Sequence, residues 1–316
     1  MDTSLVFGPV PSRRLGRSLG VNNIPPKICT YSCVYCQLGR TLDMRIERSS
    51  YYDPDEIIST VRSAVGRCRE TDQKIDYITF VPDGEPTLDE NLGRELEGVK
   101  DPGYKTAVIS NGSLIWRDDV REDLMVSDLV SLKMDSALGS VWKKVDRPHG
   151  SLDLDEIKQG MLKFSDKFRG SLITETMLIE GVNDGEESLI ETADFLSEAS
   201  PGKAYISIPT RPPAENWVRA APESNLTEAF RIFKERGLDP ELIIGYEGNR
   251  FSSTGDPRED LLSITAVHPM RDDAVEELLS RSGKSWDVVS KLIDEELIKR
   301  LDFGEHSYYL RKLNRR

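Results

Sequence analysis

Apolar positions recur with the period of a helix in some segments and with the period of a strand in others, from residue 53 to about residue 236. The first helix is predicted to begin at Asp53-Pro54-Asp55-Glu56, which offers an N-cap, a proline in the first turn and acids at the positive helix end. Ile57, Ile58, Val61 and Val65 follow at helical spacing, so this segment should bury one face.

Short runs rich in β-branched and aromatic residues, each followed by a turn signal, predict strands at Leu19–Ile24, Tyr77–Val81, Thr106–Ser110, Leu129–Met134, Leu172–Ile179 and Ala204–Ile208. Helical spacing between them predicts helices near Leu88–Val99, Leu152–Phe168, Glu186–Ser197 and Ser224–Glu235. Alternating strands and helices indicate an α/β fold with a parallel sheet. Six such units are too few to close an eight-fold barrel, and function is expected in the loops after the strands.

The alternation of strands and helices ends near Pro257. This change predicts a domain of residues 1–256 and a small C-terminal domain of residues 257–316. Two helices (Pro269–Ser280 and Trp286–Glu296) are followed by a hairpin formed by Leu297–Asp302 and Ser307–Arg311. Two helices before a hairpin are the outline of a winged helix-turn-helix. The C-terminal part is therefore predicted to be a winged-helix-like domain.

Charge limits what this small domain can bind. Residues 262–316 carry ten Lys or Arg against ten Asp or Glu, while the whole chain carries a net charge of −13. The second helix holds Asp287, Asp294, Glu295 and Glu296 against Lys291, which is a poor surface for a phosphate backbone. Contacts to a protein or within the chain are favoured over nucleic acid, although the basic tail from Arg311 onward argues the other way.

Composition indicates a globular chain, with 38% hydrophobic and 31% charged residues. No apolar run approaches the roughly 20 residues of a membrane span. The beginning of the sequence lacks the basic and apolar regions of a signal peptide. A cytoplasmic location is expected, with no membrane partner, and it suits a chain that must keep its thiols reduced.

Three of the four cysteines, Cys29, Cys33 and Cys36, fall within eight residues. A [4Fe–4S] cluster normally takes four thiolates, so three would leave one iron open to another ligand. Tyr35 gives this loop a flat apolar face beside the open iron. A chain of this length does not need disulfides, and a zinc site would need a fourth ligand at a helpful spacing. Cys68 lies on the apolar face of the first helix and is expected to be a buried thiol.

The loops after later strands offer further polar groups. Asp83-Gly84-Glu85 combines a glycine that permits close approach with acids that can accept from an ammonium group. Asn111-Gly112 is either a ligand-binding loop or an ordinary turn. Lys133 and Asp135 share one face of a strand and could reach ribose hydroxyls or a carboxylate, or could form a structural ion pair.

The Cys-x3-Cys-x-aromatic-Cys run resembles the signature of the radical S-adenosylmethionine (SAM) superfamily. This resemblance implies a partial (β/α)6 TIM-like barrel and two cofactors, a [4Fe–4S] cluster on Cys29, Cys33 and Cys36 and SAM on the open iron. By the same resemblance, Gly84 and Glu85 would hold the SAM amino group and Asn111 would lie near its carboxylate and ribose. Asp stands at position 83 where the family pattern has Gly, which weakens any role for that residue. The turn with Val182 and Asn183 would lie beside the adenine.

A closer resemblance rests on several short motifs, namely residues 7–20, 36–41, 84–88 and 181–184, Arg147-Pro-His149 and Arg211-Pro-Pro213. Together they resemble uncharacterised iron–sulfur oxidoreductases grouped near the wyosine tRNA synthetases. The synthetase uses a second cysteine-bound cluster, whereas this chain has only Cys68 to spare. The resemblance therefore implies a relative with different chemistry.

The activity implied by the resemblance is reductive cleavage of SAM to a 5′-deoxyadenosyl radical, which abstracts hydrogen from a substrate. Such an enzyme requires a low-potential electron donor such as ferredoxin or flavodoxin. Arginines are expected around the substrate mouth, because Arg binds carboxylate and phosphate bidentately; each is otherwise a solvated surface residue. The candidates are Arg13, Arg14, Arg17, Arg40 and Arg147.

Three functions stay open for the sequence. In the first hypothesis the substrate is an RNA base. The relatives and the winged-helix-like domain favour this hypothesis, and the net charge opposes it. Alternatively the substrate is a protein or peptide, including the activation of a glycyl-radical enzyme. The third hypothesis is a non-enzymatic iron–sulfur redox sensor with a winged-helix output domain. A sensor needs no SAM loops, so Gly84, Glu85 and Asn111 argue against it.

Overall fold

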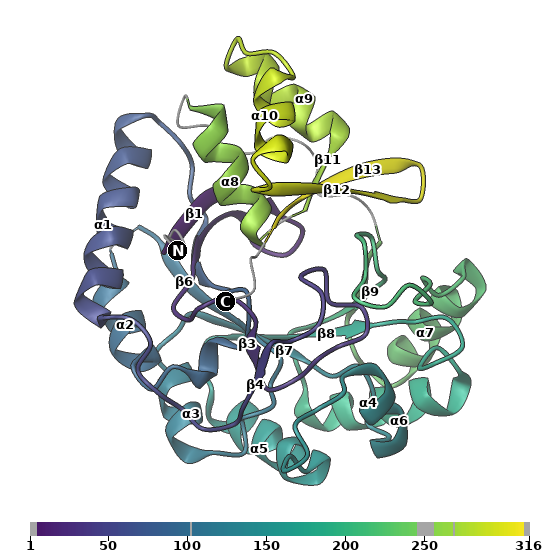
Figure 1. Ribbon diagram of the computed structural model, residues 1–316. Helices are drawn as coiled ribbons and strands as arrows, with labels where there is room; N and C mark the ends of the chain where they lie inside the picture. The colour runs from purple at the N-terminus through teal and green to yellow at the C-terminus, as the bar shows by residue number, and fades with distance from the viewer. Residues whose placement is uncertain (1–4, 102, 245–255, 268, 313–316) are drawn as a thin grey trace.

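One large sheet organises the computed structural model, which describes residues 5–101, 103–244, 256–267 and 269–312 (Figure 1). Its strand order is β1-β2-β5-β6-β7-β8-β9-β10. All neighbours from β2 to β10 pair in parallel, while β1 joins β2 antiparallel. The strands are β1 (Val6–Ser12), β2 (Gly16–Val21), β5 (Tyr77–Phe80), β6 (Lys105–Ser110), β7 (Leu129–Lys133), β8 (Ser171–Met177), β9 (Lys203–Ser207) and β10 (Pro240–Ile243).

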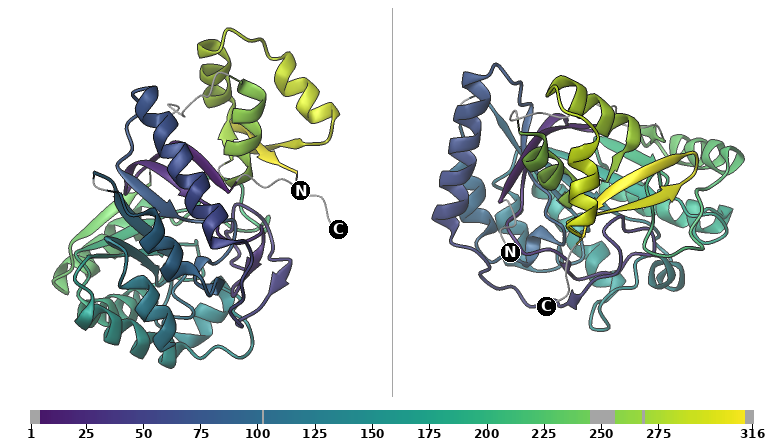
Figure 2. Two further views of the ribbon diagram at one scale, coloured as in Figure 1. Left: turned by 90° about the vertical axis from the view of Figure 1, so that its left-hand side faces the viewer. Right: turned by 45° about the horizontal axis from the view of Figure 1, so that its top comes forward.

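Helices cover the outer face of this curved sheet, and the main apolar core lies between the two layers (Figures 1 and 2). They are α1 (Pro54–Glu70), α2 (Leu92–Val99), α3 (Asp118–Leu124), α4 (Gly139–Val145), α5 (Leu154–Lys167), α6 (Glu186–Ala199) and α7 (Glu223–Glu235). The helix start at Asp53 is confirmed, because its side chain accepts from the backbone N–H of Asp55. Cys68 is buried on the inner face of α1, as expected. The predicted α/β partial barrel is confirmed.

The predicted strands and helices are found with small shifts at their ends, and several elements were not predicted, among them two edge strands and two short helices. Strands β1 and β10 extend the sheet at its two edges, and α3 and α4 are helices of seven residues each. β10 has four residues and begins with a proline, so it carries too little strand pattern to be detected. Helices of two turns show too few repeats of the apolar stripe.

The turn between β1 and β2 enters the barrel. Leu15 is 2% exposed and packs with inward-facing residues of five parallel strands, among them Leu129, Ile173 and Tyr205. Beside it, Arg14 forms an ion pair with Glu175 on β8. Arg13 donates from Nη1 to the backbone oxygen of Ile243 on β10 at 2.5 Å. This turn therefore fills the interior of the barrel and ties its first hairpin to its last strand.

The C-terminal part contains α8 (Pro257–Val267), α9 (Asp272–Arg281), α10 (Asp287–Asp294) and a three-stranded sheet in the order β11-β13-β12. β11 (Met270–Arg271) is short, and β12 (Ile298–Phe303) and β13 (His306–Arg311) form the hairpin (Figure 2). The two helices and the hairpin expected from the sequence are thus present. The winged-helix-like domain and its boundary at residue 257 stay predictions.

This C-terminal part shares its apolar core with the start of the chain. Phe7 and Val10 of β1 belong to the same buried cluster as Leu261, Ile264 and Met270. Phe7 also lies over Gly20, where a side-chain carbon would stand 2.0 Å from the ring. No helix among the described residues is long and apolar enough to cross a membrane.

Two carboxyl groups are buried together between the loop after η1 (Pro86–Leu88) and helix α2. Glu95 and Asp89 are both 0% exposed. Burial, together with the charge of Asp89, raises the pKa of Glu95 to about 9. Burial also raises the pKa of Asp89 to about 6, although Arg48 opposes the rise. Glu95 is therefore protonated in the folded protein at neutral pH.

The stability of the protein should fall as the pH rises toward 9. An unfolded Glu95 ionises near pH 4.5, so its contribution is complete below that pH and is lost as the pH rises through about 9. The loss is on the order of 1 kcal/mol per pH unit. Glu95→Gln should flatten this dependence in thermal melts between pH 6 and 9. Glu97→Gln, on the exposed side of the same helix, should leave the wild-type slope unchanged; equal slopes for all three proteins would contradict the prediction.

Candidate cofactor site

The three clustered cysteines lie in one loop at the C-terminal edge of the parallel strands. This cysteine loop (residues 29–36) begins in the short strand β3 (Ile28–Cys29), which pairs with β4 (Asp43–Met44). The segment after α4 supports it through its backbone: Ser32 N donates to Asp146 O at 3.0 Å, Val34 N to Val145 O at 2.9 Å and His149 N to Thr30 O at 2.9 Å. The segment that contains the Arg-Pro-His motif thus stabilises this loop through backbone hydrogen bonds.

The three thiols face one region, because their charges affect one another. The charge of Cys36 raises the pKa of Cys29, and the charges of Cys29 and Cys36 raise the pKa of Cys33. Burial raises the pKa of Cys29 to about 12, and it also raises the pKa of Cys33 and Cys36. Among the described residues, no three His, Cys, Asp or Glu side chains lie close enough to hold a single metal ion. A [4Fe–4S] cluster makes a different demand, because each thiolate binds a different iron.

Asn111, in the loop after β6, reaches the cysteine loop directly. Its Nδ2 donates to Thr30 Oγ1 at 2.8 Å and lies 3.5 Å from Cys29 Sγ. Ser113 Oγ donates to the same Thr30 hydroxyl at 2.7 Å. The loop after β6 therefore fixes the beginning of the cysteine loop, which accounts for the Asn-Gly turn seen in the sequence.

Glu85 has its carboxylate fully engaged within the protein. Oε1 accepts from Thr87 N, Thr87 Oγ1 and Ser110 Oγ at 3.1, 2.6 and 2.7 Å, and Oε2 accepts from Asn111 N at 2.7 Å. The residue is 1% exposed. Glu85 thus joins the loop after β5 to the loop after β6, and it orients Asn111.

Asp83, in the same loop, has a carboxyl oxygen that makes no hydrogen bond. It is 3% exposed, and its Oδ2 has no hydrogen-bond partner in the structure. Burial raises its pKa to about 8, while the cation of Lys27 opposes the rise. The charge of Asp83 in turn raises the pKa of Cys36, which places this carboxyl near the cysteine loop.

Gly84 lies where the loop after β5 contacts the backbone at the start of the cysteine loop. A side-chain carbon there would stand 2.0 Å from the carbonyl oxygen of Ile28, the residue before Cys29. Glu85 N donates to this same oxygen at 3.1 Å. The glycine therefore lets the loop after β5 lie directly against the start of the cysteine loop.

Lys133 and Asp135, at the end of β7, take part in a charged network inside the barrel. Lys133 Nζ lies 3.8 Å from Asp135 Oδ1 and 3.7 Å from Glu175 Oε1. It also lies 4.6 Å from the centre of the Tyr35 ring, a cation–π distance. The Tyr35 hydroxyl donates to Asp135 Oδ2. The network links the cysteine loop to β7 and β8, and Lys133 keeps 20% of its side chain exposed.

Val182 and Asn183 lie in the turn after β8. Asn183 is 1% exposed, and its Nδ2 donates to the backbone oxygens of Asp135 and Met177, both at 2.8 Å. Its Oδ1 accepts from Ile179 N at 2.8 Å. Asn183 thus holds the turn in shape, and Val182 packs on the small apolar cluster beside Tyr35.

The five arginines expected around the substrate mouth lie in three places in the structure. Arg13 and Arg14 belong to the turn inside the barrel, and Arg17 lies at the opposite edge, where its backbone pairs with Asp76 before β5. Arg40 and Arg147 both bind one carboxylate, that of Glu215. Arg40 and Arg147 thus lie beside the cysteine loop, and a role of the arginines at the substrate mouth stays a prediction.

Two residues near the cysteine loop escaped the sequence analysis. Asp146 accepts from the thiol of Cys33 at 3.3 Å, and Glu215 receives the two arginines just described. Asp146 stands directly before the Arg-Pro-His motif, so its position was a usable signal. Glu215 belongs to none of the sequence motifs, although it follows Arg211-Pro-Pro213 by two residues.

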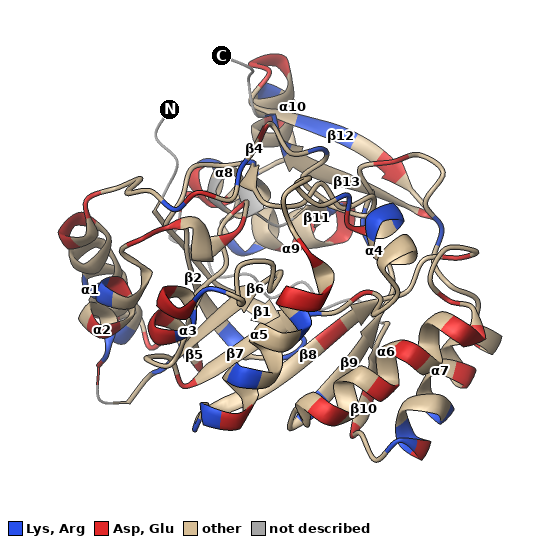
Figure 3. Ribbon diagram, turned by 90° about the horizontal axis from the view of Figure 1, so that it is seen from below, with Lys and Arg blue, Asp and Glu red and all other residues tan. Residues whose placement is uncertain are grey.

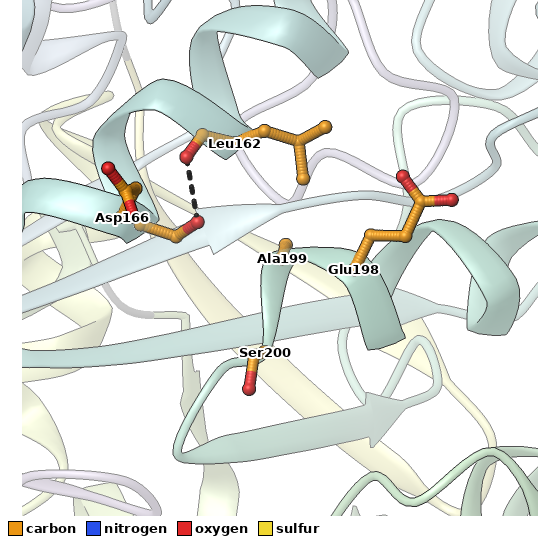
Figure 4. A pocket seen from close by; sticks show the side chains of 6 residues that line it. Leu162, Asp166, Glu198, Ala199 and Ser200 are labelled. Carbon is orange, nitrogen blue, oxygen red and sulfur yellow. Dashed lines mark hydrogen bonds between the residues drawn. The ribbon is translucent and has the colours of Figure 1, made fainter.

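A hollow between the C-terminal ends of α5 and α6 lies away from these loops (Figure 4). Its lining residues are Leu162, Ser165, Asp166, Glu198, Ala199 and Ser200. These helix ends lead into the starts of β8 and β9, so the hollow lies at the opposite edge of the sheet. It offers no thiol, and we assign no chemistry to it.

A sequence profile of the Radical SAM superfamily matches residues 23–196, which include the cysteine loop and the loops after β5 to β8. The chain belongs to the radical SAM superfamily. It is 44% identical over 315 residues to the UPF0026 protein MJ1312 of Methanocaldococcus jannaschii, covering 99% of this chain and 98% of that one.

Solved structures show the same fold at low sequence identity. A radical SAM methyltransferase from Sphaerobacter thermophilus matches with a TM-score of 0.55 and 15% identity, over 72% of this chain and 66% of that one. SuiB of Streptococcus suis, bound to S-adenosylmethionine, matches with a TM-score of 0.52 and 14% identity, over 72% and 51%. TYW1 with a bound lysine-pyruvate adduct matches over 95% and 81%, at 15% identity and a TM-score of 0.41, which is too low to bear on the substrate.

The residues present fit the two cofactors that this superfamily implies. Three thiols converge from one loop and the described residues provide no fourth cysteine beside them. The orphaned buried oxygen of Asp83 can accept from an ammonium group, and Gly84 keeps the adjoining backbone close. The donor set therefore suits a cluster with one open iron and an amino-acid ligand next to it.

Proposed function

We propose that this chain is a radical SAM enzyme whose cluster is held by Cys29, Cys33 and Cys36. The observation that carries the proposal is the convergence of these three partly buried thiols at the C-terminal edge of the barrel, beside a buried carboxyl group with an unpartnered oxygen. When bound, a reduced [4Fe–4S] cluster and SAM together supply a 5′-deoxyadenosyl radical that abstracts hydrogen from a substrate.

The side chains around the cysteine loop would hold and orient these groups. Asp83 Oδ2 would accept from the SAM ammonium, since it is the acceptor in this loop that lacks a protein partner. Glu85 acts through Asn111, which it orients by accepting from the Asn111 backbone N–H. Tyr35 and Lys133 form the wall on the side of β7.

The apolar floor below this region excludes water from the barrel. Leu15, Leu129 and Ile173 close the interior beneath the polar layer of Lys133 and Glu175. Glu175 is held by Arg14 and also accepts from Ser207 Oγ at 2.9 Å. A reactive radical formed above this layer would meet the substrate rather than solvent.

The first substrate hypothesis is an RNA base and the second is a protein or peptide. Acidic residues recur along the outer helices α6 and α7, so the helix layer does not suit RNA, which would have to approach another face (Figure 3). Binding of bulk tRNA that weakens steeply with added salt would select RNA. A low-potential donor such as ferredoxin or flavodoxin would supply the electron for either substrate.

The test is anaerobic reconstitution of the full chain with iron and sulfide, followed by dithionite and SAM. Release of 5′-deoxyadenosine together with methionine is the expected result. A stable cluster whose spectrum is unchanged by SAM, and which yields no deoxyadenosine, would contradict the proposal and favour a redox sensor. Failure to retain iron at all would contradict both.

A further inference from the structure

The segment between β9 and α7 lies against the cysteine loop. We call residues 208–222 the strap (Figure 1). Glu215 N donates to the carbonyl oxygen of Val34, the residue after Cys33, at 3.1 Å. Val218 packs on Val34 in a small buried cluster. The strap thus contacts the middle of the cysteine loop through both backbone and side chain.

A second contact follows directly after the third cysteine. Arg211 Nη1 donates to Gln37 Oε1 at 2.5 Å, and Gln37 is next to Cys36. At its beginning the strap is held by the C-terminal part, since the Tyr308 hydroxyl donates to Thr210 O at 2.9 Å. The strap therefore spans the distance between the C-terminal hairpin and the cysteine loop.

Glu215 is the charged centre of these contacts. Its Oε1 and Oε2 accept from Arg40 Nε and Nη2 at 2.8 and 3.0 Å, a bidentate pair. Its Oε1 also accepts from Arg147 Nη1 at 2.5 Å. Only 10% of the Glu215 side chain is exposed, so solvent screens these bonds less than at an open surface.

The two arginines belong to two segments that adjoin the cysteines. Arg40 follows Cys36 by four residues, and Arg147 follows Asp146, which receives the thiol of Cys33. Arg147 has a φ of 46°, which a residue with a side chain adopts only where its surroundings enforce it. One carboxylate thus joins three segments of the chain around the cysteine loop.

We infer that Glu215 is a positioning residue for the cluster: it fixes the path of the loop that carries Cys33 and Cys36. This inference rests on the function proposed above. An unconstrained loop must lose backbone freedom before three thiols can meet one cluster, and each ordered residue costs free energy. A loop that the strap already orders avoids that cost and holds the cluster more firmly.

The test compares Glu215→Gln with wild type and with Glu228→Gln. Glu228 pairs with Arg231 on the exposed face of α7 and is a matched control for the loss of one carboxylate. In the cluster-free protein, hydrogen exchange of residues 32–42 should be about tenfold faster in Glu215→Gln than in wild type and the control. Thermal melts should confirm that all three proteins remain folded.

The reconstituted proteins give an independent readout. Glu215→Gln should lose iron and sulfide several-fold faster than wild type during gel filtration, and the electron paramagnetic resonance signal of its reduced cluster should broaden. Arg40→Gln removes one arm of the network from a largely exposed side chain, and it should show a smaller effect in the same direction. This second variant keeps the test decisive if Glu215→Gln folds poorly.

The outcomes separate this inference from the proposed function. If wild type binds the cluster and cleaves SAM while Glu215→Gln matches it in exchange, cluster loss and spectrum, the positioning role is wrong and the proposed function stands. If wild type binds no cluster, the proposed function fails. The exchange experiment would still show whether Glu215 orders the loop, and equal exchange there would overturn the inference as well.

Discussion

Replacing Cys33 by alanine should abolish both cluster binding and the formation of 5′-deoxyadenosine. Cys33 is the central thiol of the loop, and its removal leaves two thiolates for a cluster that needs at least three protein ligands to leave a single open iron. The loss should exceed a hundredfold in SAM cleavage, since without a cluster no electron reaches the sulfonium. Iron and sulfide analysis, the absorbance of the reconstituted protein and an assay for deoxyadenosine measure it.

The control for this variant is Cys68→Ala. Cys68 is buried on α1, in the apolar core between helix and sheet, and takes no part in the loop. It should keep full iron content and full SAM cleavage, with a modest loss of thermal stability from the smaller side chain. A Cys33→Ala protein that still held four irons per chain would show that another residue completes the site.

Replacing Asp83 by asparagine should weaken SAM binding and leave the cluster in place. The carboxyl oxygen without a partner is the proposed acceptor for the SAM ammonium. An ammonium cation beside this buried carboxyl would favour its ionised form, and an amide cannot supply that charge. A hydrogen bond to a charged group contributes about 1.5–3 kcal/mol, which corresponds to a roughly tenfold to hundredfold rise in the dissociation constant. Calorimetric titration of the reconstituted protein with SAM measures this change.

Asp166→Asn is the matched control, because Asp166 lines the hollow at the opposite edge of the sheet. It should bind SAM with wild-type affinity. Glu85→Gln supplies the decisive comparison. If Asp83→Asn binds SAM within twofold of wild type while Glu85→Gln alone loses affinity, then Glu85 accepts from the ammonium despite its four internal hydrogen bonds.

The cysteine loop could be predicted from the sequence because its information is local. Cys29, Cys33 and Cys36 fall within eight residues, so their spacing alone restricts how the thiols can converge. The parallel strands were equally accessible, since strands buried on both faces read as short apolar runs between turn signals. The radical SAM assignment, which rests on these two patterns, is confirmed by the profile match.

The roles of single side chains could not be read in the same way. Asp83 and Glu85 stand two residues apart in one loop, and no local pattern says which of them the fold satisfies. Ser110 and Asn111, from the next strand, decide this by engaging Glu85. Glu215 was missed for a similar reason, because 175 positions separate it from Arg40 and only the folded chain brings them together.

The core shared by the first strand and the C-terminal part has a consequence for folding. Phe7 and Leu261 meet in one cluster although about 250 residues of chain separate them. Contacts over such distances close late, so β1 should remain an uncovered apolar edge until α8 is in place. An exposed edge strand pairs readily with other chains. Chains cut before residue 257 should therefore aggregate, and the last apolar contacts to form are also those that keep the folding chain soluble.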